Sequence, residues 1–195
     1  MTIPGSTASA NPWLTGRLLI AMPGMADPRF AHTVIYMCAH SGDGAMGLVV
    51  NKRSDSIVFK ELLEQVGVDD CTIQRDIPVH IGGPVETARG FVLHGGGYSH
   101  TGTMAVSDGI GLTASVDILR EVAAGGGPDH CLLALGYSGW GAGQLEQEIQ
   151  QNGWLTADAD VSLVFGADLD EDRWRTAIGT LGIDPSMLSS TAGHA

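Results

Sequence analysis

The stretch from Ala134 to Gln144, ALGYSGWGAGQ, places a serine, a tryptophan and four glycines between an apolar run and a polar one. Such a stretch could be a nucleophile elbow, a phosphate-binding loop or a tight turn. An elbow needs the spacing Gly-x-Ser-x-Gly, whereas Ser138 is preceded by Gly136 at the right distance but followed directly by Gly139. The second glycine is misplaced by one residue, so the elbow pattern is not met.

A second feature with possible chemistry is the segment from His94 to Gly97, HGGG, which has the form of the oxyanion loop of lipases and esterases. A serine hydrolase of that type also needs a histidine after its nucleophile, and the chain offers only His194, next to its last residue. A hydrolase that uses Ser138 with His94 therefore remains an alternative hypothesis. The sequence by itself assigns no catalytic residue.

The glycines Gly139, Gly141 and Gly143 match neither the dinucleotide-binding pattern nor a P-loop with its Lys-Ser/Thr pair. A strand, a glycine turn and a helix with unpaired first N–H groups can still receive an anion. The competing interpretation is structural, because glycines also let the chain reverse and let Trp140 fold over the core. The most distinctive glycine, aromatic and polar positions predict a binding groove lined by Asn51, Gly82, Gly83, Trp140, Gly143 and Gln144.

Histidines, cysteines and acids do not converge at the spacing of a metal site. The three cysteines, Cys38, Cys71 and Cys131, are widely spaced beside apolar residues, which predicts buried thiols in a reducing compartment. The acidic run from Asp168 to Asp172 lacks the glycine and closing glutamate of an EF-hand, and is typical of a helix start. We expect no metal and no cofactor.

Charge and hydropathy narrow the class of protein. The 195 residues carry a formal net charge of −12, and residues 144–195 hold 9 acids against 2 bases. No basic stripe is present to neutralise phosphates, which disfavours direct binding to nucleic acid. No apolar run approaches the ~20 residues that cross a bilayer. The start of the chain lacks the features of a signal peptide, so we expect a cytoplasmic protein with no membrane contact, a loose leader over residues 1–13 and a single domain over 14–195.

Local patterns predict more strands than helices, and the strands come in hairpin-like pairs. The expected strands cover residues 17–21, 33–38, 46–50, 79–81, 90–94, 104–106 and 131–135, the last of them central in a sheet. The expected helices start at the caps Ser56 and Ser115, at Gln144 after the glycine turn, and at Asp170. This order predicts a mixed, mainly antiparallel α+β domain.

Several separate blocks of the sequence resemble the YqgE/AlgH family of bacterial proteins. They are LTGRLLIAMPG (14–24), GAMGLVVN (44–51), GGPVE (82–86), GFVLH (90–94), ALGYSGWGAGQLE (134–146) and WLTA (154–157). The resemblance implies an α+β fold with a strongly bent, barrel-like sheet and flanking helices. Arg53 and Val116 depart from the family pattern, which usually has proline and arginine at these positions.

The resemblance also bears on function. One branch of the family is named as a transcriptional regulator linked to alginate synthesis, but no DNA-binding motif is visible here. No catalytic residue is established for the family, so none is carried over. The first hypothesis is a non-enzymatic binding or regulatory protein that acts on transcription only indirectly, through a small ligand or a protein partner. The alternatives are the hydrolase above and an acidic protein-interaction module whose C-terminal quarter meets a basic partner.

Overall fold

The computed structural model describes residues 13–68, 73–95, 97–107, 109–167 and 170–188 of the chain. Within these residues nine strands form one sheet. The strands are β1 (Arg17–Ala21), β2 (Val34–Ser41), β3 (Gly44–Val49), β4 (Val79–Ile81), β5 (Val85–His94), β6 (Met104–Ser107), β7 (Ile110–Thr113), β8 (Cys131–Gly141) and β9 (Trp154–Asp158). The helices are α1 (Phe59–Gln65), α2 (Val116–Ala123), α3 (Gln144–Gln150), α4 (Val161–Phe165), α5 (Asp170–Gly179) and a 3-10 turn, η2 (Pro185–Met187).

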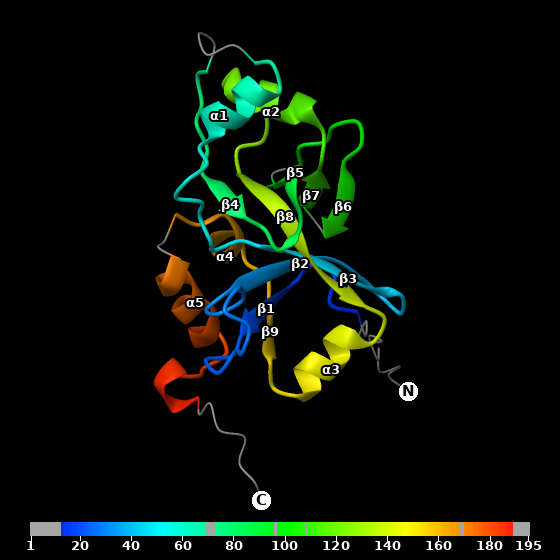
Figure 1. The fold of residues 1–195 in the computed structure, drawn as a ribbon, viewed down its shortest axis with the longest axis vertical. Coiled ribbons are helices and arrows are strands. Elements are labelled where there is room, and N and C mark those ends of the chain that lie inside the picture. Colours follow the sequence, from blue (N-terminus) through cyan, green and yellow to red (C-terminus); the bar gives the residue numbers. More distant parts are fainter. Residues whose placement is uncertain (1–12, 69–72, 96, 108, 168–169, 189–195) are drawn as a thin grey trace, which may run out of the picture.

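The long strand β8 joins the two halves of the sheet. The strand order is β6-β7-β5-β8-β3-β2-β1-β9, with β4 pairing to β8 outside this path. The first half of β8 pairs with β4 and β5, and its second half pairs with β3. Figure 1 shows β8 running from the half that carries α1 and α2 to the half that carries α3. Among the described strand pairs only β4–β8 is parallel, so the predicted mainly antiparallel α+β class is confirmed.

The sheet curls into a half-barrel that is drawn together at one end. There the hydroxyl of Tyr36 on β2 lies 2.8 Å from the hydroxyl of Ser107 at the end of β6. Gly16, just before β1, packs against the same serine, since a Cβ added to this glycine would lie 2.9 Å from the Ser107 Cβ. Strand β6, at one end of the strand order, therefore approaches β1 and β2 near the other end, and the predicted bent, barrel-like sheet is confirmed.

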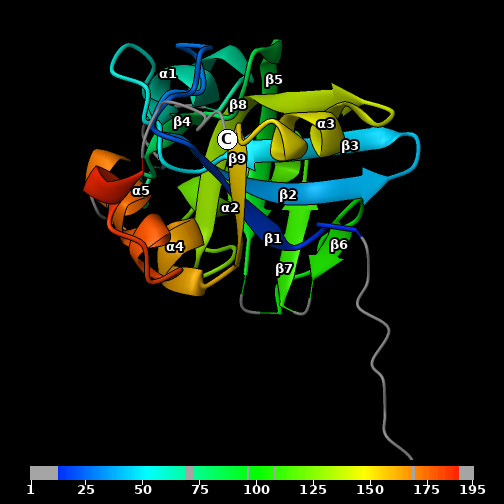
Figure 2. The ribbon, with the colours of Figure 1, turned by 90° about the horizontal axis from the view of Figure 1, so that it is seen from below.

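Strands β1 and β2 are mostly apolar because both of their faces are covered. Leu18, Ile20 and Tyr36 belong to the main core inside the half-barrel, together with residues of α4 and α5. Leu19 and Ile35 point the opposite way, into a second cluster that includes α3. Side chains alternate between the two faces of a strand, so a strand buried on both faces reads as a continuous apolar run. Figure 2 shows α3 and the pair α4 and α5 in separate places around these strands.

Many predicted elements are observed with small shifts. Strand β1 has the predicted bounds, and β2 and β3 form the predicted hairpin around Gly42 and Asp43. The Ser115 side chain accepts the Asp117 N–H and caps α2 as expected. Of the acidic run, residues 168–169 lie outside the described residues, and Asp170 starts α5.

The stretch from Ala134 to Gln144 is mostly strand, which corrects the prediction of a strand-to-helix turn. Strand β8 continues to Gly141, because residues 138–141 pair with β3, and the turn is confined to residues 142–143. Gly143 adopts φ +72° directly before α3, as only glycine does at little cost. The other glycines of the stretch serve close packing within the sheet.

Other differences have local causes. Helix α1 begins at Phe59, not near Ser56, because the Ser54 hydroxyl accepts the N–H groups of Ser56 and Ile57 and holds them in a turn. On α2, Val116 is 38% exposed and faces outward, although it is apolar. Local patterns do not predict strands β7 and β9 or helix α4, because their sequences lack a clear hydrophobic period.

Candidate functional site

The two residues of the hydrolase hypothesis lie at opposite ends of the β5–β8 ladder. Ser138 is fully buried, and its hydroxyl donates to the carbonyl of Gly82 at 3.2 Å. His94 pairs in register with Cys131, which lies seven residues before Ser138 on the same strand. At about 3.3 Å per residue, seven residues of strand span roughly 23 Å. This register weighs against a catalytic pair made of Ser138 and His94.

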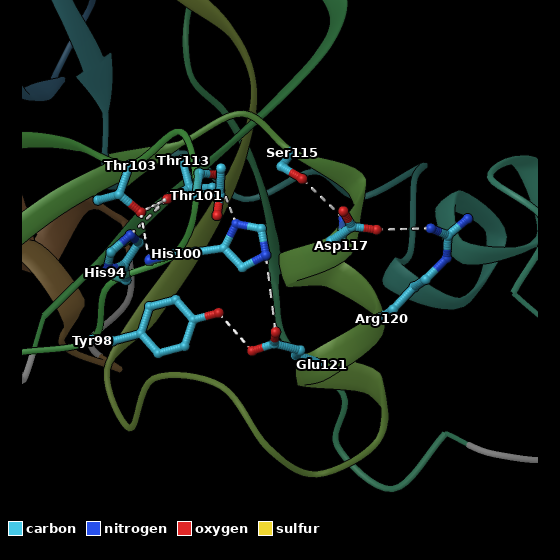
Figure 3. A network of polar contacts seen from close by, with 10 residues as sticks. All are labelled: His94, Tyr98, His100, Thr101, Thr103, Thr113, Ser115, Asp117, Arg120 and Glu121. Carbon is cyan, nitrogen blue, oxygen red and sulfur yellow. Dashed lines mark hydrogen bonds and ion pairs between the residues drawn. The ribbon is translucent and has the colours of Figure 1, made fainter.

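His94 belongs instead to a chain of hydroxyl and imidazole groups between β5, β7 and the loop before β6 (Figure 3). Its Nε2 lies 2.9 Å from the Thr113 hydroxyl, which lies 2.7 Å from the Thr103 hydroxyl. The Thr103 hydroxyl in turn accepts the backbone N–H of His100 at 3.0 Å. His94 is only 1% exposed, and its Nδ1 has no hydrogen-bond partner among the described residues. Burial, and to a smaller extent His100, lowers the pKa of His94, which favours the neutral ring.

Next to this hydrogen-bond network, the Glu121 carboxylate of α2 lies between the side chains of Tyr98 and His100 (Figure 3). Its Oε2 accepts the Tyr98 hydroxyl at 2.6 Å, and its Oε1 lies 3.9 Å from Nε2 of His100. Desolvation raises the pKa of Tyr98 to about 12, helped by the hydrogen bond to Glu121. The Tyr98 phenol is therefore a hydrogen-bond donor at neutral pH and not a base.

A cleft of about 590 Å³ lies beside Trp140 at the end of β8, and we call it the tryptophan cleft. One wall comes from β8, α3 and β9, with Trp140, Gln144 and Trp154. Its full lining consists of Gly24, Met25, Ala26, Asp27, Arg29, Phe30, Pro84, Val85, Gly139, Trp140, Gln144, Glu148, Gln151, Asn152, Gly153 and Trp154. Segments far apart in sequence thus meet at one hollow.

One carboxylate organises that wall. Oε2 of Glu148 accepts the indole N–H groups of Trp140 at 2.9 Å and of Trp154 at 2.8 Å. Oε1 of Glu148 accepts an N–H from the Gln144 side-chain amide at 2.9 Å. The side-chain Oε1 of Gln144 accepts the backbone N–H of Gly141 at 3.0 Å. The two indole rings meet edge to face at 6.0 Å. Hydrogen bonds to a charged acceptor are stronger than neutral ones, so the network holds the wall in one arrangement.

The opposite wall is the loop between β1 and β2. Asp27 accepts the backbone N–H of Arg29 at 3.0 Å and a guanidinium N–H at 2.7 Å. These hydrogen bonds from Arg29 lower the pKa of Asp27. The Phe30 ring lies 5.7 Å from the Trp154 ring. The cleft therefore presents an ion pair on one side and a side-chain amide on the other, over an aromatic base.

The structure brings some of the predicted groove residues to this cleft and leaves others apart. Trp140 and Gln144 line it, and Gly143 supplies the turn between them. Gly82 and Gly83 lead into Pro84 of the lining but are themselves buried against β8, where a Cβ on Gly83 would lie 2.2 Å from the Tyr137 backbone. Asn51 lies apart from the cleft. Its side chain accepts the Val34 N–H at 2.7 Å and donates to the His32 carbonyl at 2.9 Å, so it ties β2 to the end of β3.

Sequence reasoning missed Glu148, Asp27 and Arg29. Glu148 follows Gln144 by four residues in a predicted helix, and this spacing places both side chains on one face. That signal was available, but the indole partners of Glu148 come from two different strands and no local pattern reveals them. Asp27 and Arg29 come close to Trp140 and Trp154 only in the tertiary fold.

A second cleft, of about 710 Å³, lies on the other side of the border formed by Val85, Gly139 and Trp140. Its lining includes residues of the β2–β3 hairpin and of β6, and we call it the barrel-mouth cleft. Its apolar base includes Phe91 and Tyr137.

Two further findings concern thiols and metals. Burial raises the pKa of Cys38 to about 12, and it also raises the pKa of the half-buried Cys131, so neither thiol ionises at neutral pH. Both are free, while Cys71 lies outside the described residues.

In the described ranges no three His, Cys, Asp or Glu side chains are grouped so that they could hold a metal ion. None of the described helices is long and apolar enough to span a membrane.

A curled, mainly antiparallel sheet with five described α-helices and two clefts on β8 defines an α+β half-barrel protein. Residues 18–186 match the AlgH-like family, DUF179, and the chain belongs to this family. It is 52% identical over 183 residues to a UPF0301 protein of Rhodospirillum rubrum, covering 94% of this chain and 95% of that one. It is 56% identical to a UPF0301 protein of Cereibacter sphaeroides, covering 93% and 99%.

Solved structures agree with this assignment. The solution structure of the AlgH protein from Pseudomonas aeruginosa superposes with a TM-score of 0.76 at 42% identity and covers all of both chains. A crystal structure of a Corynebacterium diphtheriae protein has a TM-score of 0.69 at 24% identity, covering 87% of this chain and 88% of that one, and shows the shared fold.

Proposed function

We propose that this chain is a non-enzymatic binding protein that takes a small polar ligand in the tryptophan cleft. The observation that carries the proposal is the convergence of Trp140, Trp154 and Gln144 on the carboxylate of Glu148. Binding sites are concave and largely preformed, with a few polar groups that fix the orientation of the ligand. A wall held by three hydrogen bonds to one carboxylate meets that description.

The groups around the cleft favour a ligand with both donors and acceptors. Arg29 offers guanidinium N–H groups, Asp27 and Glu148 offer carboxylate oxygens, and Gln144 and Asn152 offer amides. The charged groups carry two negative charges and one positive charge, which disfavours a polyphosphate or a nucleic-acid backbone. A regulatory role in transcription, which the AlgH branch name suggests, would accordingly be indirect and would act through the bound ligand or a protein partner.

Within this proposal the predicted groove residues have two kinds of role. Trp140 and Gln144 face the ligand side, whereas Gly82, Gly83, Gly143 and Asn51 support the walls. The distinction matters for testing, because replacement of a supporting residue changes the fold as well as the cleft.

The test is a thermal-shift screen of the purified protein against polar metabolites and nucleotides. A ligand that binds only the native state raises the melting temperature by mass action. A hit that is lost in Gln144→Ala and kept in Gln147→Ala would support the proposal, since Gln147 is exposed on the same helix and does not line the cleft. A hit unaffected by Gln144→Ala and Arg29→Ala would place binding elsewhere, and no hit would shift weight to a protein partner.

The second candidate is the acidic interaction module, which the composition of residues 144–195 favours. Exposed charges are screened within about 10 Å at 0.1 M salt. Partners captured in a pull-down should therefore be lost as ionic strength rises. Partners that stay bound at high salt would count against a charge-driven interface.

A further inference from the structure

The barrel-mouth cleft is the open end of the half-barrel. Strand β6 contacts β2 through Ser107 at one end, whereas Met104 at its other end lines the cleft. The β2–β3 hairpin faces it with Ser41 and Asp43. The halves of the sheet therefore meet on one side and separate on the other, and the mouths of β-barrels are recurrent ligand sites.

The base of this cleft is apolar and continuous with the main core. Phe91 and Leu112 are core residues, and Met46 and Tyr137 pack against them. The Phe91 and Tyr137 rings meet edge to face at 5.8 Å. Met104, at the edge, is 42% exposed. An apolar body that enters the cleft would cover this surface, with a gain of about 25 cal/mol per Å² removed from water.

A large bulge in β5 builds the rim. Strand β5 advances five residues from Val85 to Gly90 while β8 advances two from Tyr137 to Leu135, so β5 carries three extra residues. The bulge packs on Gly136, where an added Cβ would lie 2.8 Å from the carbonyl oxygen of Val85. The glycine-rich stretch of β8 therefore lets the bulge sit over the cleft.

The bulge places one ion pair at the rim. Glu86 accepts a guanidinium N–H from Arg89 at 3.2 Å, and the Arg89 guanidinium carbon lies 5.0 Å from the centroid of the Phe91 ring. Asp43 adds a carboxylate from the hairpin and forms no ion pair among the described residues. The charged groups of the cleft are thus two carboxylates and one guanidinium, on a chain with a net charge of −12.

We propose that the barrel-mouth cleft is a second binding site, and that it takes an organic cation with an apolar body. The apolar body occupies the base formed by Phe91, Tyr137 and Met46, and the cationic group lies at the rim near Asp43 and Glu86. The placement of Arg89 over Phe91 already shows a cation held on an aromatic ring of this cleft. An anionic amphiphile would be repelled by the excess negative charge of the cleft.

The experiment compares two fluorescent probes that share one apolar body. Dansylcadaverine carries an ammonium group at neutral pH, and dansylglycine carries a carboxylate. Because exposed charge pairs are individually weak, dansylcadaverine should bind roughly three- to tenfold more tightly at low salt. Equal or tighter binding of dansylglycine would overturn the proposal.

Two variants locate the binding and the charge effect. Ala114→Trp, at an exposed position of the lining, should weaken both probes, whereas Ala142→Trp, exposed but outside both clefts, should not. The double variant Asp43→Asn/Glu86→Gln should remove the preference for the cation. The double variant Glu64→Gln/Asp129→Asn changes the net charge equally at exposed positions away from the cleft and should keep the preference.

Outcomes for the two clefts remain distinguishable. Gln144 lines the tryptophan cleft and not the barrel-mouth cleft, so Gln144→Ala should leave dansylcadaverine binding unchanged. Loss of probe binding in Gln144→Ala with no effect of Ala114→Trp would overturn the second site and move the probe to the tryptophan cleft. Loss in Ala114→Trp alone would support it, whatever the outcome of the metabolite screen.

Discussion

The indole nitrogens of Trp140 and Trp154 donate to the same oxygen, Oε2 of Glu148, at 2.9 and 2.8 Å. The two tryptophans belong to different strands, β8 and β9, which are not neighbours in the sheet. Helix α3 carries the carboxylate between them, so this contact fixes the helix against both halves of one wall. The relationship makes Glu148 the residue whose removal should be felt most in the tryptophan cleft.

We expect Glu148→Ala to destabilise the protein by about 2–6 kcal/mol, because two indole N–H groups lose their acceptor and each unsatisfied group costs about 1–3 kcal/mol. Urea denaturation followed by fluorescence measures the change, and the signal reports directly on the tryptophans. Gln147→Ala on the exposed face of α3 is the control and should stay within about 0.5 kcal/mol of wild type. A Glu148→Ala protein as stable as wild type would show that the indoles find other partners.

Gly136→Ala should destabilise the protein more than Gly143→Ala. Both glycines have similar positive φ, +69° and +72°, which costs an L-residue about 1 kcal/mol. A Cβ at Gly136 would also lie 2.5 Å from the Gly83 carbonyl oxygen, whereas nothing lies within 4 Å at Gly143. We therefore expect about 1 kcal/mol for Gly143→Ala and about 3 kcal/mol or more for Gly136→Ala. Equal losses would mean that the β5 bulge moves freely away from β8.

Stability should fall with acidification in a window set by His94. Burial, and then His100, lowers the pKa of His94 below its ordinary value of 6.5. The unfolded chain then binds more protons than the folded one, so this contribution is complete above pH 6.5 and is lost as the pH falls below it. Glu121 does not stabilise a charged His94, since it accepts from Tyr98 and faces His100.

His94→Gln should accordingly flatten the dependence of unfolding free energy on pH between about pH 5 and pH 7. His130→Gln, at an exposed histidine, is the control for loss of an imidazole in general. Urea titrations at several pH values give the slope for each variant. An unchanged slope in His94→Gln would show that other groups govern this window.

Ser138→Ala should cost about 0.5–1.5 kcal/mol, the usual value of one hydrogen bond, because the hydroxyl donates to the Gly82 carbonyl. It should leave any ester or phosphoester turnover of the purified protein unchanged. Loss of a measurable wild-type activity in this variant, with the fold intact, would revive the serine hydrolase hypothesis.

How far the sequence anticipated the site can be seen at Trp140 and Asn51. Both were predicted to line one groove, and the reasoning used only their place in distinctive blocks. The structure puts Trp140 on the border of both clefts and uses the Asn51 amide to join β2 and β3. A distinctive sequence block indicates that a residue type is needed at a position. It does not show whether that residue is needed for a hydrogen bond inside the fold or for contact with a ligand.

The sequence by itself determined the family, the mainly antiparallel α+β class, the β2–β3 hairpin and the capped start of α2 at Ser115. These features rest on local chemistry, namely alternation, turn glycines and a side chain that caps its own helix. Only the tertiary structure decided that β8 runs on through the glycines to Gly141, and that Gly136 lets the β5 bulge form a rim. Pairing between distant strands and the sharing of Glu148 by two tryptophans depend on contacts across the sheet, which no local pattern encodes.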